Sequence, residues 1–423
     1  MKTIPLILMG CGGVGSHLLQ HIVSCRSLHS LQGLLLRVVG VGDSKSLMVV
    51  DDLLNKGLDD NFLLELCRLK HAGESISKLA DRHCHVFAHP ESQGKIVEIA
   101  SQLGKKSGLA FVDCTASSGT VSVLKQVVDM GCCVVMANKK PLTSTMLNNN
   151  PYMEQEDYEN LMKYPRRIRH ESTVGAGLPV IASLNRIISS GDPVHRIVGS
   201  LSGTLGYVMS EVEDGKPLSQ VVRAAKSLGY TEPDPRDDLG GMDVARKVCF
   251  SSGKFTFAVV PALSKTHKSV SYFSKILVLC LANGASALIL ARILGRRINM
   301  DSIQVESLYP KEMGPDVMTV DDFLGRGLLL LDNDIQERVE KAASNGNVLR
   351  YVCVIEGPRC KVGVQELPKN SALGRLRGSD NVLEVYTRCY SDQPLVIQGA
   401  GAGNDTTAAG VLADIVDIQD LFP

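Results

Sequence analysis

The feature of the sequence that most constrains its fold is a glycine-rich loop directly after the first apolar run. The run covers Ile4–Met9, and a helical stretch, Gly15–Ser24, follows the loop. In a Gly-x-Gly-x-x-Gly loop between a strand and a helix, the glycines permit a tight turn, close approach to a pyrophosphate and close helix–strand packing. The free N–H groups at the helix start then face the phosphates. The loop therefore predicts a dinucleotide site contacted by Gly10, Gly12, Gly13, Val14 and Gly15.

Short strand-like runs alternate with helical stretches through the first part of the chain. Buried runs recur at Leu35–Val41, Ala110–Val112 and Cys132–Met136, which is typical of a parallel sheet with crossover helices. From about His170 the strands are mixed differently with helices. We predict an α/β fold, a Rossmann-type doubly wound parallel sheet with a second α+β domain. The expected parts are residues 1–169 for nucleotide binding, 170–393 for the second domain, and 394–423 for a strand–glycine–helix segment that returns to the nucleotide domain.

Polar residues follow several of the predicted strands, where the carboxyl ends of an open parallel sheet hold the ligand. Thr115 follows one strand, and Asn138 and Lys139 follow another. After the second strand, Asp43 could accept both ribose hydroxyls and favour NAD, whereas Ser44 and Lys45 could receive a 2′-phosphate and favour NADP. The sequence leaves NADH and NADPH open.

The charge balance argues for a small-molecule ligand. Lys+Arg and Asp+Glu number 45 each, so no net field attracts nucleic acid or an anionic membrane. The run Ile4–Met9 is too short for a signal sequence or a membrane span. Twelve cysteines without zinc spacing indicate free thiols in a reducing compartment. We expect a cytoplasmic protein, or a plastid one if a transit peptide is missing from this chain.

The most specific stretch is an acidic run, Gly229–Lys247. It contains two prolines that exclude a continuous helix through its first half, while its second half can be helical from about Leu239. A helix there places Asp243 and Lys247 four residues apart on one face. Taken alone, the run is compatible with a solvated acidic turn followed by a helix salt bridge.

Several motifs in register resemble the homoserine dehydrogenase family. They are the Gly-Tyr-x-Glu-Pro-Asp-Pro-x-x-Asp run with its Asp-Val-Ala-Arg-Lys ending, the connector Glu171–Pro179, Ser202-Gly203-Thr204, Ala137–Pro141 and Gly401–Asn404. The resemblance implies NAD(P)H-dependent reduction of L-aspartate 4-semialdehyde to L-homoserine, a step of threonine, methionine and isoleucine biosynthesis. It also implies a homodimer formed through the second domain.

The resemblance assigns roles to individual residues. Lys247 is the implied proton donor, and Lys139 is placed near the nicotinamide and the reacting oxygen. Carboxylates can hold the substrate ammonium by charge-assisted hydrogen bonds. The implied substrate contacts are Glu232, Asp238, Asp243 and Thr204, and Thr115 and Gly403 are implied as further cofactor contacts.

The same resemblance implies a structural Na⁺ site in the connector. Its ligands would be the Glu171 side chain and the backbone carbonyls of Val174, Ala176 and Leu178. One carboxylate with several carbonyls suits a hard cation. Taken from spacing alone, the connector is a glycine turn.

One segment departs from the family pattern. The helix expected directly after Lys247 is present at Ala287–Arg297, so we interpret residues 248–286 as an insert, either a gene-model artefact or a genuine loop. An insert beside the proposed proton donor could displace it. The alternative function is therefore a catalytically impaired homologue that still binds the nucleotide.

Other dehydrogenases fit less well. A 2-hydroxy acid dehydrogenase needs an arginine and a histidine–carboxylate pair, which the ten histidines do not indicate. Aspartate-semialdehyde dehydrogenase needs a nucleophilic cysteine, and we expect Cys114 to be a buried, inert thiol instead. No aspartate kinase domain and no C-terminal regulatory extension are expected.

Overall fold

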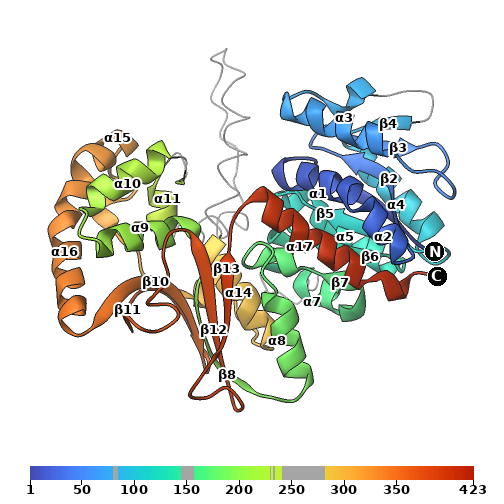
Figure 1. The fold of residues 1–423 in the computed structure, drawn as a ribbon. Coiled ribbons are helices and arrows are strands. Elements are labelled where there is room, and N and C mark those ends of the chain that lie inside the picture. The colour runs from blue at the N-terminus through green and yellow to red at the C-terminus, as the bar shows by residue number, and fades with distance from the viewer. Residues whose placement is uncertain (80–83, 144–156, 229, 232–233, 241–281) are drawn as a thin grey trace, which may run out of the picture. The chain divides into compact units, whose positions relative to one another are not determined.

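The computed structural model describes residues 1–79, 84–143, 157–228, 230–231, 234–240 and 282–423 (Figure 1). The chain forms two compact units, the first joining residues 1–182 to 402–423 and the second spanning 183–401. The divisions at 182/183 and 401/402 differ from the expected ones at 169/170 and 393/394. The connector after residue 170 belongs to the first unit, because its 3₁₀ turn η4 (Glu171–Thr173) packs on helix α17 (Asn404–Asp417).

The first unit is built on a sheet in the order β4-β3-β2-β1-β5-β6-β7. Its strands are β1 (Lys2–Met9), β2 (Leu34–Gly42), β3 (Ser46–Val50), β4 (Cys84–Ala88), β5 (Ala110–Asp113), β6 (Cys133–Met136) and β7 (Ile168–Arg169). The pairs among β2, β1, β5, β6 and β7 are parallel, as expected for a Rossmann-type sheet. Strands β3 and β4 extend it as an antiparallel edge, which the sequence reasoning did not anticipate.

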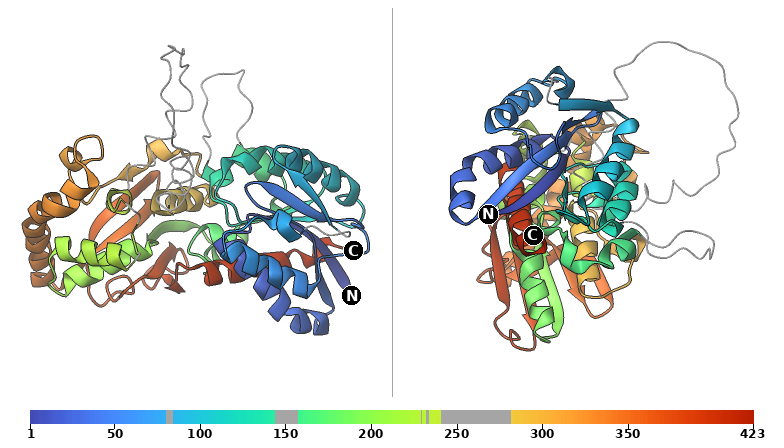
Figure 2. Two further views of the ribbon diagram at one scale, coloured as in Figure 1. Left: turned by 90° about the horizontal axis from the view of Figure 1, so that it is seen from above. Right: turned by 90° about the vertical axis from the view of Figure 1, so that its right-hand side faces the viewer.

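Helices connect and cover these strands. They are α1 (Gly13–Ser24), α2 (Arg26–Leu31), α3 (Asp60–His71), α4 (Glu91–Leu103), α5 (Val121–Asp129), α6 (Lys140–Thr143), α7 (Asp157–Met162) and α17. Helix α17 packs on α1 and on β6, so the last helix completes the core begun by the first. The two chain ends lie side by side in all three views (Figures 1 and 2). Lys2 Nζ lies 2.8 Å from Asp420 Oδ1.

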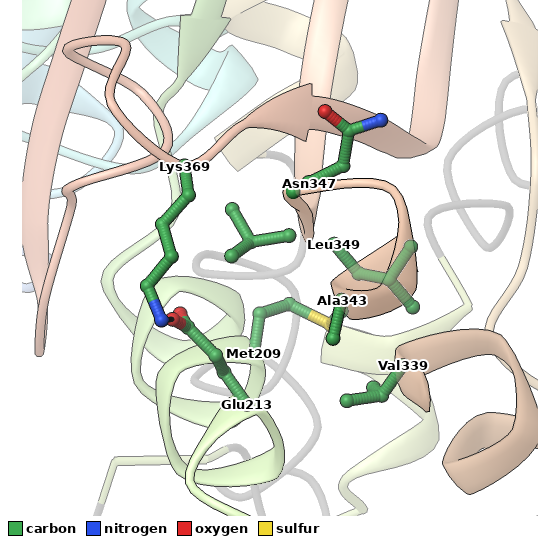
Figure 3. Close-up of a pocket in the computed structure, with 9 residues that line it drawn as sticks. Met209, Glu213, Val339, Ala343, Asn347, Leu349 and Lys369 are labelled. Carbon is green, nitrogen blue, oxygen red and sulfur yellow. Dashed lines mark ion pairs between the residues drawn. The ribbon is translucent and has the colours of Figure 1, made fainter. Parts of the chain in front are cut away.

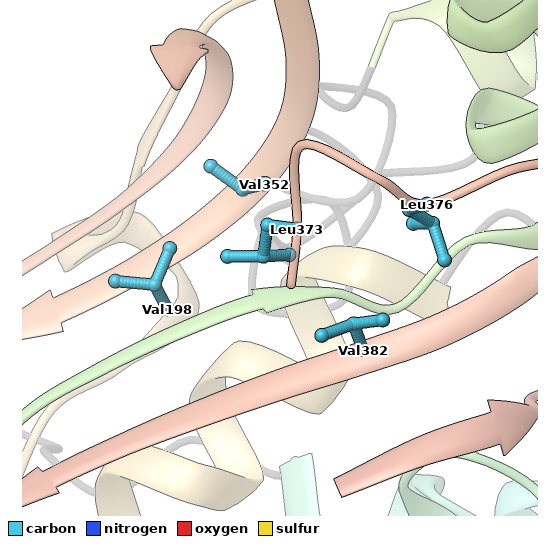
Figure 4. Close-up of a cluster of buried hydrophobic side chains, with 5 residues drawn as sticks. All are labelled: Val198, Val352, Leu373, Leu376 and Val382. Carbon is cyan, nitrogen blue, oxygen red and sulfur yellow. The ribbon is translucent and has the colours of Figure 1, made fainter. Parts of the chain in front are cut away.

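The second unit contains a sheet in the order β13-β12-β8-β10-β11-β9. Its strands are β8 (Val194–Ser200), β9 (Gln304–Val305), β10 (Asn347–Glu356), β11 (Arg359–Pro368), β12 (Asp380–Thr387) and β13 (Leu395–Ala400). All pairs are antiparallel except β11 with β9. A buried apolar cluster between this sheet and the segment before β12 forms part of the core (Figure 4): Val198, Val352, Leu373, Leu376 and Val382.

The helices of this unit include α8 (Val180–Ser189), which crosses the division, α9 (Gly203–Glu213), α10 (Leu218–Ser227), α11 (Arg236–Leu239), α14 (Ala282–Ile293), α15 (Val320–Asp322) and α16 (Leu328–Ser344). A π-helical segment, Phe323–Gly327, joins α15 to α16. Helices α9 and α16 pack on β10, and α14 packs on β10 and β11.

Two expectations about the second half were wrong. The strand near Pro394 does not return to the nucleotide sheet, because β13 pairs along its whole length with β12, and only the helix after it returns. The helix expected at Ala287–Arg297 is present with other bounds: it begins earlier, at Ala282, and Ala285 and Ser286 are buried in it. It ends earlier as well, because Gly295 adopts φ +77° and terminates the helix.

Within the part of the chain that the structure describes, we find no helix that is both long and apolar enough to cross a membrane.

Candidate active site

The glycine loop has the geometry that its pattern predicts. Gly10 has φ +93°, and a Cβ there would lie 2.7 Å from the backbone of Cys114 and Thr115. A Cβ on Gly15 would overlap the carbonyl oxygen of Gly10, so helix α1 can pack against the turn only without a side chain. A Cβ on Gly12 would meet no atom within 4 Å. The loop is therefore closed on the protein side and open at Gly12.

The start of α1 offers N–H donors beside this open position. Its N-cap is Gly12, which has no side chain to accept the first-turn N–H groups. The carboxamide of Asn404, at the start of α17, lies against the same place, since a Cβ on Gly13 would be 2.5 Å from its nitrogen. The residues present thus fit a pyrophosphate, which N–H groups at a helix start bind. Asn404 was not among the cofactor contacts selected from the sequence, although Gly403 beside it was.

Gly403 itself serves as the N-cap of α17 with φ +118°, a conformation that favours glycine. Its carbonyl oxygen accepts bonds from the Thr406 and Thr407 hydroxyls at 3.1 and 2.7 Å. The second glycine-rich turn therefore gives the chain a sharp entry into α17 next to the first glycine loop.

Asp43 follows β2 but does not present a free carboxylate. Its Oδ1 accepts the N–H groups of Lys45 and Ser46 at 2.9 and 3.0 Å, and its Oδ2 is 2.9 Å from Lys70 Nζ on α3. The side chain is only 8% exposed. Burial raises the pKa of this carboxyl, but the bond from Lys70 and the two backbone bonds outweigh burial, so its pKa lies below the ordinary value.

Lys139 lies where β6 ends and α6 begins. No carboxylate of the described residues is within ion-pair distance of its ammonium, and desolvation lowers its pKa to about 8. Its backbone carbonyl accepts bonds from the Leu142 N–H and the Thr143 hydroxyl. A lysine held in this way can exchange a proton near neutral pH, which suits a group placed beside a reacting carbonyl oxygen.

Thr115 lies at the end of the neighbouring strand, β5. Its N–H donates to Asp113 Oδ1 at 2.9 Å, and its hydroxyl accepts bonds from Ser117 N–H and Asn138 Nδ2 at 3.3 and 3.2 Å. The structure thus brings Thr115 and the Asn138–Lys139 pair to one edge of the sheet. Asp113, which joins them, was not among the residues selected from the sequence.

Cys114 is partly buried rather than fully buried as expected, and its surroundings favour the neutral thiol, which agrees with an inert cysteine. Burial and the nearby charge of Asp113 raise the pKa of its thiol far above the ordinary value. Since the thiolate is the reactive form, this cysteine is a poor nucleophile.

Glu171, the expected Na⁺ ligand, caps helix α8. Its Oε1 accepts the Ile181 N–H at 2.6 Å and its Oε2 accepts the Ala182 N–H at 2.7 Å. The backbone N–H of Glu171 donates to Asp414 Oδ2 at 2.9 Å, so two buried carboxylates lie close together. Burial raises the pKa of both carboxyls, that of Asp414 to about 7. Burial thus disfavours the charged forms of both carboxyls, and a small cation beside them would stabilise those forms.

The three connector residues expected to offer backbone carbonyls to Na⁺ are in different surroundings. Leu178 O accepts the Val180 N–H at 2.8 Å. Ala176 has φ +56°, which is rare for a residue with a side chain. Val174 is fully buried. Within the described residues, no cluster of three or more His, Cys, Asp or Glu side chains could hold a metal, so a cation here would depend on these carbonyls.

In the second unit, the expected substrate residues fall partly within the described chain. The Thr204 hydroxyl donates to the Tyr230 carbonyl at 2.6 Å, so Thr204 supports the start of the acidic run. Asp238 lies in α11 and its N–H donates to Pro235 O. The other expected residues, Glu232, Asp243 and Lys247, lie outside the described residues.

The acidic run is also anchored by Arg236, which the sequence reasoning did not select. Its guanidinium pairs with Asp234 at 2.7 Å, donates to Met318 O at 2.6 Å and lies over the Phe323 ring. The side chain is 3% exposed. This buried arginine ties the run to the π-helical segment.

A small cavity of about 110 Å³ in the second unit contains none of these residues (Figure 3). Met209 and Glu213 from α9 and Lys369 line it, and Lys369 Nζ lies 3.6 Å from Glu213 Oε1. The other Glu213 oxygen pairs at 2.6 Å with Arg350, which is 1% exposed. We interpret the cavity as a packing gap beside a structural ion pair.

The chain matches one known protein family over most of its second half. The family model described as homoserine dehydrogenase matches residues 179–261 and 283–416, just over half of the chain. The chain is also similar to homoserine dehydrogenase of Saccharomyces cerevisiae, with 30% identity over 426 residues that cover 99% of this chain and 98% of the relative. The chain belongs to the homoserine dehydrogenase family.

The matched ranges of the family model overlap the expected insert at 248–286. The homoserine dehydrogenase model matches residues up to 261 and again from 283, so it leaves out residues 262–282 within that segment. Lys247 therefore has family-matched sequence directly after it.

Bifunctional members of the homoserine dehydrogenase family are longer. The chain is 30% identical over 415 residues to the bifunctional aspartokinase/homoserine dehydrogenase of Haemophilus influenzae, covering 98% of this chain and 43% of that protein. Among solved structures, a hyperthermophilic archaeal homoserine dehydrogenase in complex with NADPH superposes with a TM-score of 0.63 at 19% identity, covering 100% of this chain and 99% of that one. That likeness supports the same fold.

Proposed function

We propose that this protein reduces L-aspartate 4-semialdehyde to L-homoserine with NAD(P)H. The observation that carries the proposal is the family match over residues 179–261 and 283–416, which covers the second unit except for 262–282. It is joined to a glycine loop whose geometry fits a pyrophosphate. Under this proposal the alternative of a catalytically impaired homologue is set aside, since the family pattern continues past Lys247.

The reaction assigns a task to each part of the site. When bound, the reduced nicotinamide supplies the hydride that turns the aldehyde into an alkoxide. Lys247 gives the alkoxide its proton, and Lys139 holds the reacting oxygen by charge. Glu232, Asp238 and Asp243 bind the substrate ammonium, and Thr204 keeps the acidic run in place through Tyr230. The first unit holds the dinucleotide through the Gly10–Gly15 loop, Thr115 and Gly403.

The experiment is an assay of NADPH oxidation with L-aspartate 4-semialdehyde, using the full chain and a Lys247→Ala variant. We expect turnover by the full chain and a loss of about a hundredfold or more in kcat in the variant, because general acid catalysis contributes on that order. Lys226→Ala, a lysine in the last turn of α10, is the control. Absence of turnover by the full chain would refute the proposed reaction, and normal turnover of Lys247→Ala would refute only the assigned proton donor.

We also propose a structural Na⁺ at the connector, held by the Glu171 carboxylate and the carbonyls of Val174, Ala176 and Leu178. The two buried carboxylates beside it support a cation there.

A homodimer formed through the second unit completes the proposal. It is supported by β13, an edge strand of the sheet on which Val396 is 40% exposed, since open edges pair readily with a second chain. Light scattering is expected to give twice the chain mass of 45.6 kDa, and a monomer would contradict the dimer.

A further inference from the structure

A buried polar network lies at the edge of the first unit's sheet, where β5 and β6 end. At its centre is Asp113, whose side chain is fully buried. Oδ1 accepts the Thr115 N–H at 2.9 Å, and Oδ2 accepts the Thr120 hydroxyl at 2.6 Å and the Asn138 amide at 3.0 Å. No cation of the described residues forms an ion pair with it.

The network continues from Asp113 to the residues on both sides of Lys139. The Asp113 carbonyl oxygen accepts the N–H groups of Ala137 and Asn138 at 2.9 and 3.3 Å. Asn138, which is 2% exposed, donates to Asp113 and accepts the Lys140 N–H at 3.1 Å through its own side-chain oxygen. The main chain of Lys139 is therefore held between two fixed neighbours.

The donor and acceptor pattern requires a carboxylate at this position. An ionised carboxylate only accepts hydrogen bonds, and each oxygen of Asp113 faces at least one donor. If asparagine replaced Asp113, its NH₂ group would face a hydrogen-bond donor whichever way the amide was turned. The carboxylate also determines how the Asn138 side chain is turned, with nitrogen towards Asp113 and oxygen towards Lys140.

We propose that Asp113 is a positioning residue for hydride transfer, which fixes Lys139 and Thr115 at the nicotinamide end of the dinucleotide site. The proposal rests on the proposed function. Asp113 acts through the two residues and contacts neither substrate nor cofactor. A displacement of a reacting group by about 1 Å can cost about a hundredfold in rate, so a buried group that sets this edge has a measurable effect on turnover.

The test uses Asp113→Asn together with a matched pair at the second donor, Thr120→Val and Thr120→Ser. Valine keeps the shape of threonine and removes the hydroxyl, whereas serine keeps the hydroxyl. Asp129→Asn, the same chemical change at an exposed position on α5, is the control. Each variant is measured for the Kd of NADPH from the fluorescence of the reduced nicotinamide, for kcat and KM, for the pH profile of kcat/KM, and for its melting temperature.

We expect Asp113→Asn to raise the Kd of NADPH about tenfold, to lower kcat and to shift the alkaline limb of the pH profile, because Lys139 moves. Thr120→Val should change these values in the same direction but less, while Thr120→Ser and Asp129→Asn stay near wild type. If Asp113→Asn and Thr120→Val only melt earlier, with unchanged Kd, kcat and pH profile, Asp113 is structural and the proposal is overturned.

Failure of the proposed function is a separate outcome. If the wild-type chain binds NADPH but does not reduce the semialdehyde, the assigned reaction fails. Asp113 is then judged by the Kd of NADPH in the four variants alone. Should Asp113→Asn fail to fold, the comparison of Thr120→Val with Thr120→Ser still tests whether the Asp113 network positions Lys139 and Thr115.

Discussion

The ion pair between Asp43 and Lys70 bears on the choice between the two nicotinamide cofactors. A free carboxylate after the second strand binds the ribose hydroxyls of NAD, but here Lys70 and two backbone N–H groups occupy the carboxylate of Asp43. Lys45 beside it is exposed. The local charge therefore favours a 2′-phosphate.

We expect kcat/KM for NADPH to exceed that for NADH in the wild-type protein. Lys70→Ala removes the charge and frees Asp43, which should reduce the NADPH-to-NADH ratio by about tenfold, the worth of one charge-assisted hydrogen bond. Lys78→Ala, which breaks the exposed pair with Glu74 nearby, is the control and should leave the ratio unchanged. A wild-type preference for NADH, or a ratio unaffected by Lys70→Ala, would contradict the assignment.

The lowered pKa of Lys139 predicts how kcat/KM depends on pH. Desolvation lowers it to about 8, so the ammonium is present below pH 8 and is lost as the pH rises through that value. We expect kcat/KM for semialdehyde reduction to fall above about pH 8 in the wild type. In Lys139→Arg the charge persists at high pH, so activity should be lower but the limb near pH 8 should disappear. If kcat/KM of Lys139→Arg still fell above about pH 8, the fall would come from the titration of another group.

At the scale of single elements, the connector and the helices it joins allow a test of the proposed Na⁺ site. A ligand that binds only the folded state adds stability, about 2.7 kcal/mol at a hundred times its Kd. We therefore expect NaCl to raise the melting temperature above that in choline chloride at equal ionic strength. Glu171→Gln should abolish the difference, while Glu91→Gln, an exposed carboxylate in the first turn of α4, should preserve it. Equal melting in both salts would exclude the cation.

The elements themselves show what the sequence could reveal. The strands near Ile4–Met9 and Leu35–Val41 were predicted because an apolar run followed by a glycine loop or a polar turn has a local signature. The short buried strand β3 was missed, because its start depends on the turn that Asp43 forms with Lys45 and Ser46. The turn residues were interpreted as ligand contacts instead.

The same distinction applies to the candidate site. The geometry of the glycine loop was predicted, because a fixed spacing within six residues determines its turn and its close packing. Asp113 and Asn404 were missed, because their importance comes from partners distant in sequence, such as Asn138 for one and Gly13 for the other. A single polar residue after a strand does not reveal which distant residues it will contact.

At the scale of the whole molecule, the segment without a family counterpart can be tested by deletion. We expect a chain lacking residues 262–281, which lie between the two matched ranges and before α14 begins at Ala282, to keep its kcat. A chain lacking residues 248–286 should melt earlier and lose activity, because it also removes Ala285 and Ser286, which are 0% and 1% exposed in α14. The kcat and melting temperature of the two deletion variants would be compared with those of the full chain. If the two variants had the same kcat and melting temperature, the expected difference between them would be contradicted.

The return of the chain to its first unit has a consequence for synthesis. Helix α17 packs on α1 and β6, yet it is made only after residues 183–401, which form the other unit. Domains commonly fold in order as they leave the ribosome. Here the first unit lacks one of its core helices until Asn404–Asp417 emerges, so its nascent form exposes the apolar surface on which Val411 and Ile415 are later buried. A premature stop anywhere in the second unit would therefore damage the nucleotide-binding unit, although every residue of the glycine loop had already been made.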